Sequence, residues 1–191
     1  MNYLGHLVLS EKDDEILFGN FIADAIKGRS YLDWPDKIQK GILLHRFIDE
    51  FTDNNIYYLK GKRRFYKSYP KIGGIINDIV YDYLLWQYYI DNNILELNME
   101  IKRFHSVLDK YRNDMPEKIK FMYTYMKRDN WLLNYKYDWG VKKALWGIGK
   151  RINYSNNLDQ SFNVVIDNLE DFKNEFQLFY SEIQMKVSSF M

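Results

Sequence analysis

The chain has 191 residues, of which 47% are hydrophobic and 28% are charged, a balance typical of one folded domain and not of a disordered chain. A formal net charge of +1 gives no general attraction for nucleic acid or membranes, and no apolar run is long enough to cross a bilayer, so we expect neither as a partner. With no cysteine and no recognisable secretory signal, the sequence excludes a disulfide framework and predicts a cytoplasmic protein.

The first predicted helix follows an apolar opening that contains His6. We expect Ser10 to cap this helix, because acidic residues fill the turn that follows. The pattern continues to Gly28, and glycine commonly ends a helix because it tolerates the left-handed conformation. Inside this helix Asn20 and Asp24 lie four positions apart among apolar residues, which predicts a polar pair on one face.

The central predicted helix starts near Pro35 and ends at about Asp53. It places His45, Asp49 and Asp53 at successive steps of four residues, one polar stripe on an otherwise apolar segment. Burying a carboxylate or an imidazole among apolar residues is unfavourable unless a partner compensates the charge. A metal ion would be such a partner.

Residues 54–77 contain no acidic side chain, although the whole chain is nearly neutral, and this predicts a local basic face. A strongly helical pattern follows, in which Asp78 and Asp82 form another pair four residues apart. The basic residues of the interval are Lys60, Lys62, Arg63, Arg64, Lys67 and Lys71.

The second half of the chain is predicted to be helical throughout. Apolar periodicity marks helices over about 91–115, 116–135, 138–150 and 158–187. His105 has no acidic companion and is interpreted as a surface residue. With no repeat and no hairpin signal, we predict an all-α, single-domain helical bundle over residues 1–191.

Three predicted helices therefore each carry a polar pair in apolar surroundings. A histidine and several aspartates from different helices suit Mn²⁺ or Mg²⁺, or a mixed nitrogen and oxygen site for Fe²⁺ or Zn²⁺. Such an ion supports phosphoester hydrolysis, because it activates water and neutralises phosphoryl oxygens, and Arg46 could hold the phosphate. Salt bridges between the helices would explain the same pattern without any catalysis. The pairs are Asn20/Asp24, His45/Asp49 and Asp78/Asp82.

Five segments match a known family in order and spacing: NYLGHLVLS, GNFIADAIKG, GILLHRFIDEFTDN, DIVYDYLL and NWLLNY. Through them the chain resembles the acyl carrier protein phosphodiesterase family over nearly its whole length, most closely over residues 1–86. The resemblance implies an all-helical fold related to the HD-domain phosphohydrolases. It also implies removal of 4′-phosphopantetheine from holo-acyl carrier protein with a divalent metal, usually manganese.

Carried onto this sequence, the resemblance implies a set of site residues. We expect Asp24, His45 and Asp78 to ligate the metal. Asp49 or Asp82 would complete the ligand shell or act as the general base. The residues expected to hold phosphate, to orient ligands or to contact the substrate are Arg46, His6, Asn20 and Asp53.

Two positions depart from the family pattern. Tyr83 stands where the family often has histidine, which could alter a contact to a ligand or an acid role. Arg46 follows His45 where an ordinary HD pair has aspartate, so the HD ligand scheme does not transfer intact.

Acyl carrier proteins are small and acidic, so the resemblance implies that the basic interval is a docking face with salt-sensitive association. Lys62, Arg63 and Arg64 are its predicted contact residues. Two other interpretations stay open. One is the same hydrolysis on a nucleotide or another small phosphoester, and the other is a helical module that binds an acidic partner without catalysis.

Overall fold

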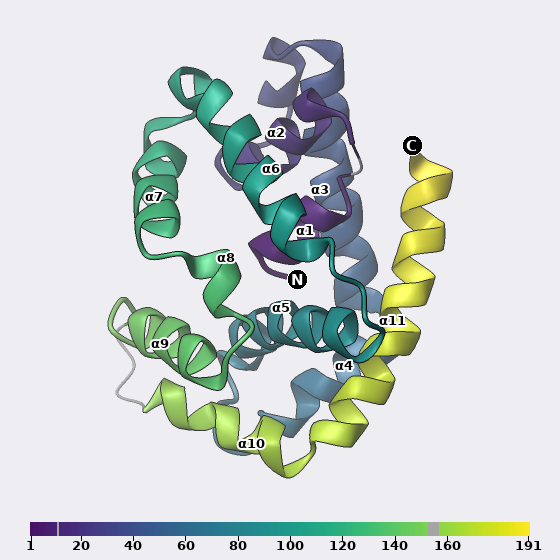
Figure 1. The fold of residues 1–191 in the computed structure, drawn as a ribbon, viewed down its shortest axis with the longest axis vertical. Coiled ribbons are helices and arrows are strands. Elements are labelled where there is room, and N and C mark those ends of the chain that lie inside the picture. Colours follow the sequence, from purple (N-terminus) through teal and green to yellow (C-terminus); the bar gives the residue numbers. More distant parts are fainter. Residues whose placement is uncertain (11, 153–156) are drawn as a thin grey trace.

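The computed structural model describes residues 1–10, 12–152 and 157–191, and every regular element in these ranges is a helix (Figure 1). The predicted all-α class is confirmed. Within the described ranges, no helix is both long and apolar enough to cross a membrane. The α-helices are α1 (Tyr3–Val8), α2 (Asp14–Ile22), α3 (Asp36–Asn54), α4 (Ile56–Arg64), α5 (Gly73–Asp91), α6 (Leu97–Lys110), α7 (Glu117–Arg128), α8 (Trp131–Asn134), α9 (Asp138–Gly149), α10 (Phe162–Asp167) and α11 (Leu169–Phe190). Short 3-10 helices are η1 (Ala23–Ala25), η2 (Ser30–Asp33), η3 (Arg112–Asp114) and η4 (Leu158–Ser161).

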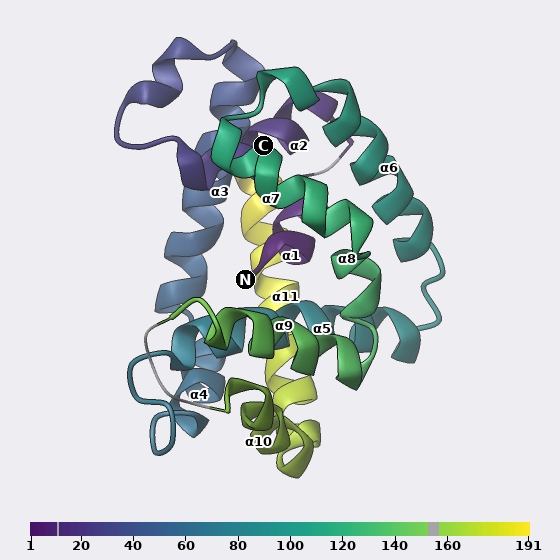
Figure 2. The ribbon, with the colours of Figure 1, turned by 90° about the vertical axis from the view of Figure 1, so that its left-hand side faces the viewer.

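Helices α3 and α5 frame the middle of the molecule. Figures 1 and 2 show α3 running along the long axis and α5 lying across its lower end. The C-terminal helix α11 packs against α3, α4 and α5. The short helix α1 lies near the centre, in contact with α2 and α5, and the N-terminus points into the interior beside it. The first residues of the chain are therefore surrounded by elements from much later positions.

A close crossing of α2 and α3 depends on two glycines that face each other. A Cβ atom on Gly19 would lie 2.2 Å from the carbonyl oxygen of Ile38, and one on Gly41 would lie 2.2 Å from that of Ile16. Only a residue without a side chain allows this approach. The crossing brings Asn20 of α2 next to His45 of α3.

Helix α1 was not predicted, and it is held by a residue far away in sequence. The two carboxylate oxygens of Asp82 accept hydrogen bonds from the backbone N–H groups of Leu4 and Gly5, each at 3.0 Å. A carboxylate at this end of a helix pairs otherwise unsatisfied N–H groups and complements the helix dipole. A helix of six residues is too short to form alone, so the capping pattern within the local sequence could not reveal it.

The predicted start and end of the next helix are wrong. Asp13, not Ser10, caps α2, because its side chain accepts from the N–H groups of Glu15 and Ile16. Ser10 is buried and donates its hydroxyl to the carbonyl oxygen of His6 at 2.8 Å. The α-helix ends at Ile22 and tightens into η1, although Gly28, at φ +56°, lies in the left-handed region as predicted.

The later boundaries are right in part. Helices α3, α5, α6 and α9 confirm the predicted segments, whereas α4 was predicted only as a basic interval. The segment 116–135 divides at Asn130, which has φ +50°, and the segment 158–187 divides at Asn168. His105 is half-buried rather than a surface residue, with its ring centroid 5.9 Å from that of Tyr123.

Candidate metal and phosphoester site

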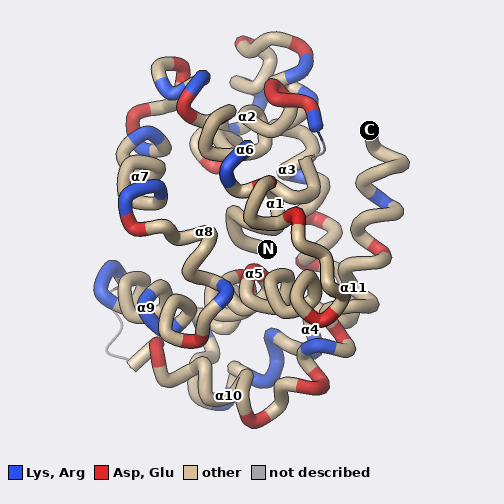
Figure 3. Tube along the Cα trace, in the orientation of Figure 1, with Lys and Arg blue, Asp and Glu red and all other residues tan. Residues whose placement is uncertain are grey.

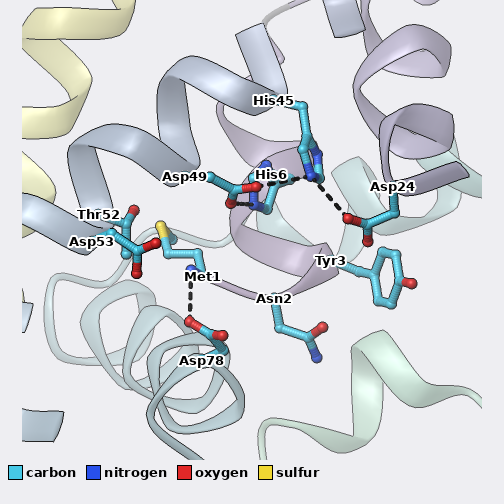
Figure 4. Close-up of a pocket in the computed structure, with 10 residues that line it drawn as sticks. All are labelled: Met1, Asn2, Tyr3, His6, Asp24, His45, Asp49, Thr52, Asp53 and Asp78. Atoms are coloured by element: carbon cyan, nitrogen blue, oxygen red, sulfur yellow. Dashed lines mark hydrogen bonds and ion pairs between the residues drawn. The ribbon is translucent and has the colours of Figure 1, made fainter. Parts of the chain in front are cut away.

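A polar cavity of about 310 Å³ opens beside α1 and gathers side chains from α1, α3, α5 and η1 (Figure 4). Six predicted site residues meet there, from positions that are up to 72 residues apart (78 − 6) in the chain. The lining residues are Met1, Asn2, Tyr3, His6, Asp24, His45, Asp49, Thr52, Asp53 and Asp78.

Two stacked imidazole rings and one carboxylate form the centre of the cavity. The ring centroids of His6 and His45 are 4.1 Å apart, with the ring planes 22° from parallel. Asp49 bridges them, with one oxygen 3.2 Å from Nε2 of His6 and the other 3.2 Å from Nε2 of His45. Asp24 adds a second carboxylate, 3.4 Å from Nε2 of His45. The two Nε2 atoms and the two carboxylates therefore converge on the same side of the rings (Figure 4).

Asn20 contacts both rings on the side away from the cavity. Its Oδ1 lies 3.1 Å from Nδ1 of His6 and 3.0 Å from Nδ1 of His45. Its Nδ2 donates to the carbonyl oxygen of His6 and to Oγ of Ser10. The reverse amide orientation would set two acceptor oxygens, Asn20 Oδ1 and the His6 carbonyl, against each other. Both Nδ1 atoms therefore carry hydrogen, and the two Nε2 atoms are left for the cavity.

Burial and neighbouring charges shift the pKa values of His6 and His45 in opposite directions. Burial lowers the pKa of His6 to about 4, and the nearby His45 acts in the same direction. Burial also opposes charge on His45, but hydrogen bonds with Asp24 and Asp49 outweigh it and raise the pKa to about 9. The pKa of Asp49 lies well below its usual value, because its bonds to the two histidines outweigh its own burial.

The geometry of the cluster and the neutral state of His6 fit a divalent cation, which would take the place of the proton that His45 holds on Nε2. A neutral His6 with hydrogen on Nδ1 turns the lone pair of Nε2 towards a carboxylate oxygen of Asp49 at 3.2 Å. Two acceptors at this distance need a positive centre between them. The candidate ligand atoms of His6, His45 and Asp49 all lie within 4.8 Å of one another. Two imidazole nitrogens and a carboxylate form a mixed donor set of the kind that binds Mn²⁺, Fe²⁺ or Zn²⁺.

Asp78 and Asp53 line the cavity but lie outside the three-residue group. One oxygen of Asp78 accepts from the α-amino group of Met1 at 3.0 Å and from the hydroxyl of Tyr58 at 2.8 Å. Asp53 is exposed at the edge, four residues after Asp49. The predicted ligand Asp78 is thus occupied by two donors, while His6, which was expected only to orient ligands, joins the cluster.

The structure does not bring Asp82 or Arg46 into the lining of this cavity. Asp82 is fully buried, burial raises its pKa to about 7, and its oxygens hold the start of α1. Arg46 donates to the carbonyl oxygen of Ile26 at 2.9 Å, and its guanidinium carbon lies 5.2 Å from the ring centroid of Tyr31. This placement gives Asp82 a supporting position behind α1 and turns Arg46 towards the segment after η1.

Two other predicted features also have structural partners. Tyr83 is buried, with its ring edge-on to Phe162. Arg64 forms two hydrogen bonds with Glu175 of α11, at 2.6 and 2.9 Å, so it is held against α11. Lys62 is half-buried and Arg63 is exposed, and these two remain on the surface of α4.

Thr52 and Tyr3 are cavity residues that the sequence did not single out. The Thr52 hydroxyl is buried, lines the cavity and has no hydrogen-bond partner among the described residues. Thr52 follows Asp49 by three positions and His45 by seven, so the same helical spacing that revealed the stripe would have included it. Tyr3 had no such signal, because α1 was not predicted.

Comparisons with known proteins identify relatives over almost the whole chain. A family model described as acyl carrier protein phosphodiesterase matches residues 1–183. A protein of that name from Photorhabdus laumondii is 27% identical over 192 aligned residues, which cover 99% of this chain and 96% of that protein. Its counterparts from Klebsiella pneumoniae (26% identical, 96% and 95% covered) and Yersinia pestis (25% identical, 94% of each) are similar. No solved structure matches, so the HD-domain likeness stays a prediction.

Proposed function

Because the chain belongs to the acyl carrier protein phosphodiesterase family, a group of hydrolases, we propose that its polar cavity cleaves the phosphodiester of holo-acyl carrier protein. Water would attack the phosphorus and the bond to the serine oxygen would break. The serine oxygen takes up a proton to give the apo protein, and 4′-phosphopantetheine leaves as a phosphate monoester.

We assign His6, His45 and Asp49 to the divalent cation. The observation that carries this assignment is the pair of Nε2 atoms that face one carboxylate, with both Nδ1 atoms bound to Asn20. When bound, such an ion neutralises charge on phosphoryl oxygens and makes water more acidic. Mn²⁺ is the ion that the family resemblance implies, and the nitrogen-rich donor set also suits Fe²⁺ and Zn²⁺ better than Mg²⁺.

Two further residues have proposed roles in handling the proton and the phosphate. Asp24 is the general base, because its side chain lines the cavity, is 59% exposed and lies beside His45 without belonging to the three-residue group. Thr52 donates its free hydroxyl to a phosphoryl oxygen, since this buried group has no described partner. These assignments revise the expectation that Asp24 and Asp78 are ligands.

The partner is proposed to be an acidic carrier protein that docks on α4. Lys60 and Arg63 are exposed there, and Tyr58 on the same helix contacts Asp78 in the cavity lining. A positive surface next to the cavity suits a small acidic partner. We place the reaction in the cytoplasm, where a chain without cysteine fits the reducing conditions.

A mass-shift assay tests the proposal. Holo-acyl carrier protein incubated with the protein and Mn²⁺ should lose the mass of phosphopantetheine, and a chelator should stop the reaction. His45→Ala and Asp49→Ala should abolish both turnover and Mn²⁺ binding, whereas His105→Ala, which changes the histidine outside the cavity, should preserve both. Full turnover by either cavity variant would overturn the assignment.

A further inference from the structure

A second cavity of about 270 Å³ lies next to the first, between α8, α9 and the start of the chain. Its volume is near the lower end of small-molecule sites, which span about 300–1,000 Å³. Trp131, Ala144, Trp146 and Ile148 give it an apolar wall. Unlike the first cavity, it therefore offers contacts to carbon chains.

The two cavities share a wall. Asn2 and Tyr3 line both of them. Burial raises the pKa of Tyr3 to about 12, Asp24 of the first cavity acts in the same direction, and Arg151 of the second acts against it. The Tyr3 hydroxyl thus lies within electrostatic reach of charged groups in both cavities, and a ligand longer than either cavity could pass along Asn2 and Tyr3.

We propose that the second cavity binds the pantetheine arm of the substrate, an inference that rests on the proposed function. The arm begins at the phosphate, and it carries a branched hydrocarbon and two neutral amides. With the phosphate beside His6 and His45, the arm would pass Tyr3 and reach the apolar wall of the second cavity. Burial there favours the hydrocarbon parts of the arm.

The positive charge of Arg151 also suits the phosphate end of the arm. Arg151 lines the second cavity and forms no ion pair with any carboxylate among residues 1–10, 12–152 and 157–191. A guanidinium group free to bind suits a phosphate, since its planar donors match phosphate oxygens. The path therefore offers a guanidinium group to the phosphate and an apolar wall to the hydrocarbon, in the order in which these parts follow one another in phosphopantetheine.

Gly147 offers a way to fill this cavity without disturbing the core. It lines the cavity on α9, and a Cβ atom there would meet no described atom within 4 Å. Gly147→Phe should therefore place a ring in the space of the arm. Lys142→Phe is the matched control, because it adds the same ring to an exposed position of α9 outside the lining.

Binding of free pantetheine, without added metal, is followed by tryptophan fluorescence, since Trp131 and Trp146 line the cavity. Gly147→Phe should weaken binding at least about tenfold, and Lys142→Phe should leave it unchanged. Arg151→Gln should weaken 4′-phosphopantetheine by about tenfold and uncharged pantetheine not at all. Equal pantetheine binding by Gly147→Phe and the wild type, or no binding by a folded wild type, would overturn the proposal.

Turnover of holo-acyl carrier protein separates this proposal from the proposed function. Gly147→Phe should lower kcat/KM by a factor similar to its loss of pantetheine affinity. If the wild type turns over and Gly147→Phe is equally active, the arm lies elsewhere and the function stands. If pantetheine binds to the wild type but not to Gly147→Phe, and the wild type releases no 4′-phosphopantetheine from holo-acyl carrier protein, the proposed function is wrong and the binding cavity is supported. A loss confined to long-chain acyl substrates would assign the cavity to the acyl chain and contradict the proposal.

Discussion

Asn20 contacts the Nδ1 atoms of both cavity histidines. Its single Oδ1 accepts from two Nδ1 atoms, and its Nδ2 is fixed by Ser10 and the His6 carbonyl. A metal-ligating histidine usually needs such a partner, because the bond to the far nitrogen fixes the tautomer and the ring orientation. The predicted orienting role of Asn20 stays a proposal, and it can be tested directly.

Replacing Asn20 with leucine should lower Mn²⁺ affinity about 10–100-fold, because both rings lose the acceptor that fixes their tautomer. Asn20→Asp should retain more affinity than Asn20→Leu, since a carboxylate still accepts from both Nδ1 atoms. Titration calorimetry with Mn²⁺ measures the difference. Asn54→Leu, at an exposed position of α3, serves as the control. Equal affinities for Asn20→Leu and the wild type would show that the tautomers are fixed by other groups.

His105 should make the stability of the protein depend on pH. Burial lowers its pKa, with Lys127 acting in the same direction and Asp109 against it. The unfolded chain, with a histidine pKa of about 6.5, therefore takes up a proton before the folded chain does. The free energy of unfolding should fall as the pH drops from about 7 through this lowered pKa.

His105→Gln removes this titration, so the difference in unfolding free energy between the wild type and the variant should shrink as the pH falls. Urea denaturation at several pH values measures it, and a constant difference would contradict the assignment. The residue shows what sequence spacing cannot supply. An isolated histidine in a helical pattern gave no sign of Tyr123, which packs on it from α7.

Residue spacing identified pairs of candidate residues along the chain, but not which members of different pairs meet. His45 and Asp49 lie on α3 four positions apart, and the stripe they form was evident in the sequence. His6 and Asp82 could not be ranked in the same way. Asp82 binds the N–H groups at the start of α1 and therefore lies outside the cavity lining, whereas His6 on the same helix joins the cluster. Only the folded chain shows this contact between α1 and α5.

At the scale of elements, the glycine crossing of α2 and α3 is the contact that builds the site. Gly41→Ala would force a methyl group to within 2.2 Å of the Ile16 carbonyl oxygen, so α2 must move away from α3 and carry Asn20 with it. We expect a loss of about 1–3 kcal/mol in unfolding free energy and weaker Mn²⁺ binding.

Gly74→Ala is the matched control, because its Cβ would meet only the flexible end of Lys62 at 3.4 Å. Alanine there should be neutral or stabilise by up to about 1 kcal/mol, since it favours the helix more than glycine does. Thermal denaturation and Mn²⁺ titration of the two variants measure both effects. A Gly41→Ala protein as stable as Gly74→Ala would mean that the crossing is looser than the structure indicates.

The element scale also explains which helices could be predicted. Helices α3 and α5 have 19 residues each, and their apolar periodicity extends over several turns. Helices α1 and α4 have 6 and 9 residues and depend on partners for their stability. The basic run of α4 was read as a surface property, although Tyr58 on the same helix is buried against Tyr81.

Across the whole molecule, the proposed docking helix and the proposed arm cavity lie on different sides of the N-terminal segment. In Figure 1, α4 lies to the lower right of the N-terminus and α9 to its lower left. A phosphodiester has a protein on one side and the pantetheine arm on the other. The arrangement of α4, the polar cavity and α9 therefore follows the order of the substrate's own parts.

Only some of the basic residues predicted to form a docking face contribute to a positive surface on α4. Figure 3 shows basic segments of α4 beside acidic segments of α11. Arg64 is paired there with Glu175 and lies 3.6 Å from Asp171, so it contributes to the packing of α11 instead of to a free positive surface. Arg63, which is exposed on the same helix, is the better residue for testing an acidic partner.

Arg63→Glu should raise the KM for holo-acyl carrier protein several-fold at low salt, with little change in kcat, because a surface charge acts on the encounter with the partner and not on the reacting atoms. The effect should fade as salt screens the charges. Lys118→Glu, an exposed charge reversal on α7, is the control, since α7 lies far from α4 in both views. A similar rise in KM for both variants would indicate a general charge effect, and no rise for Arg63→Glu would move the docking surface away from α4.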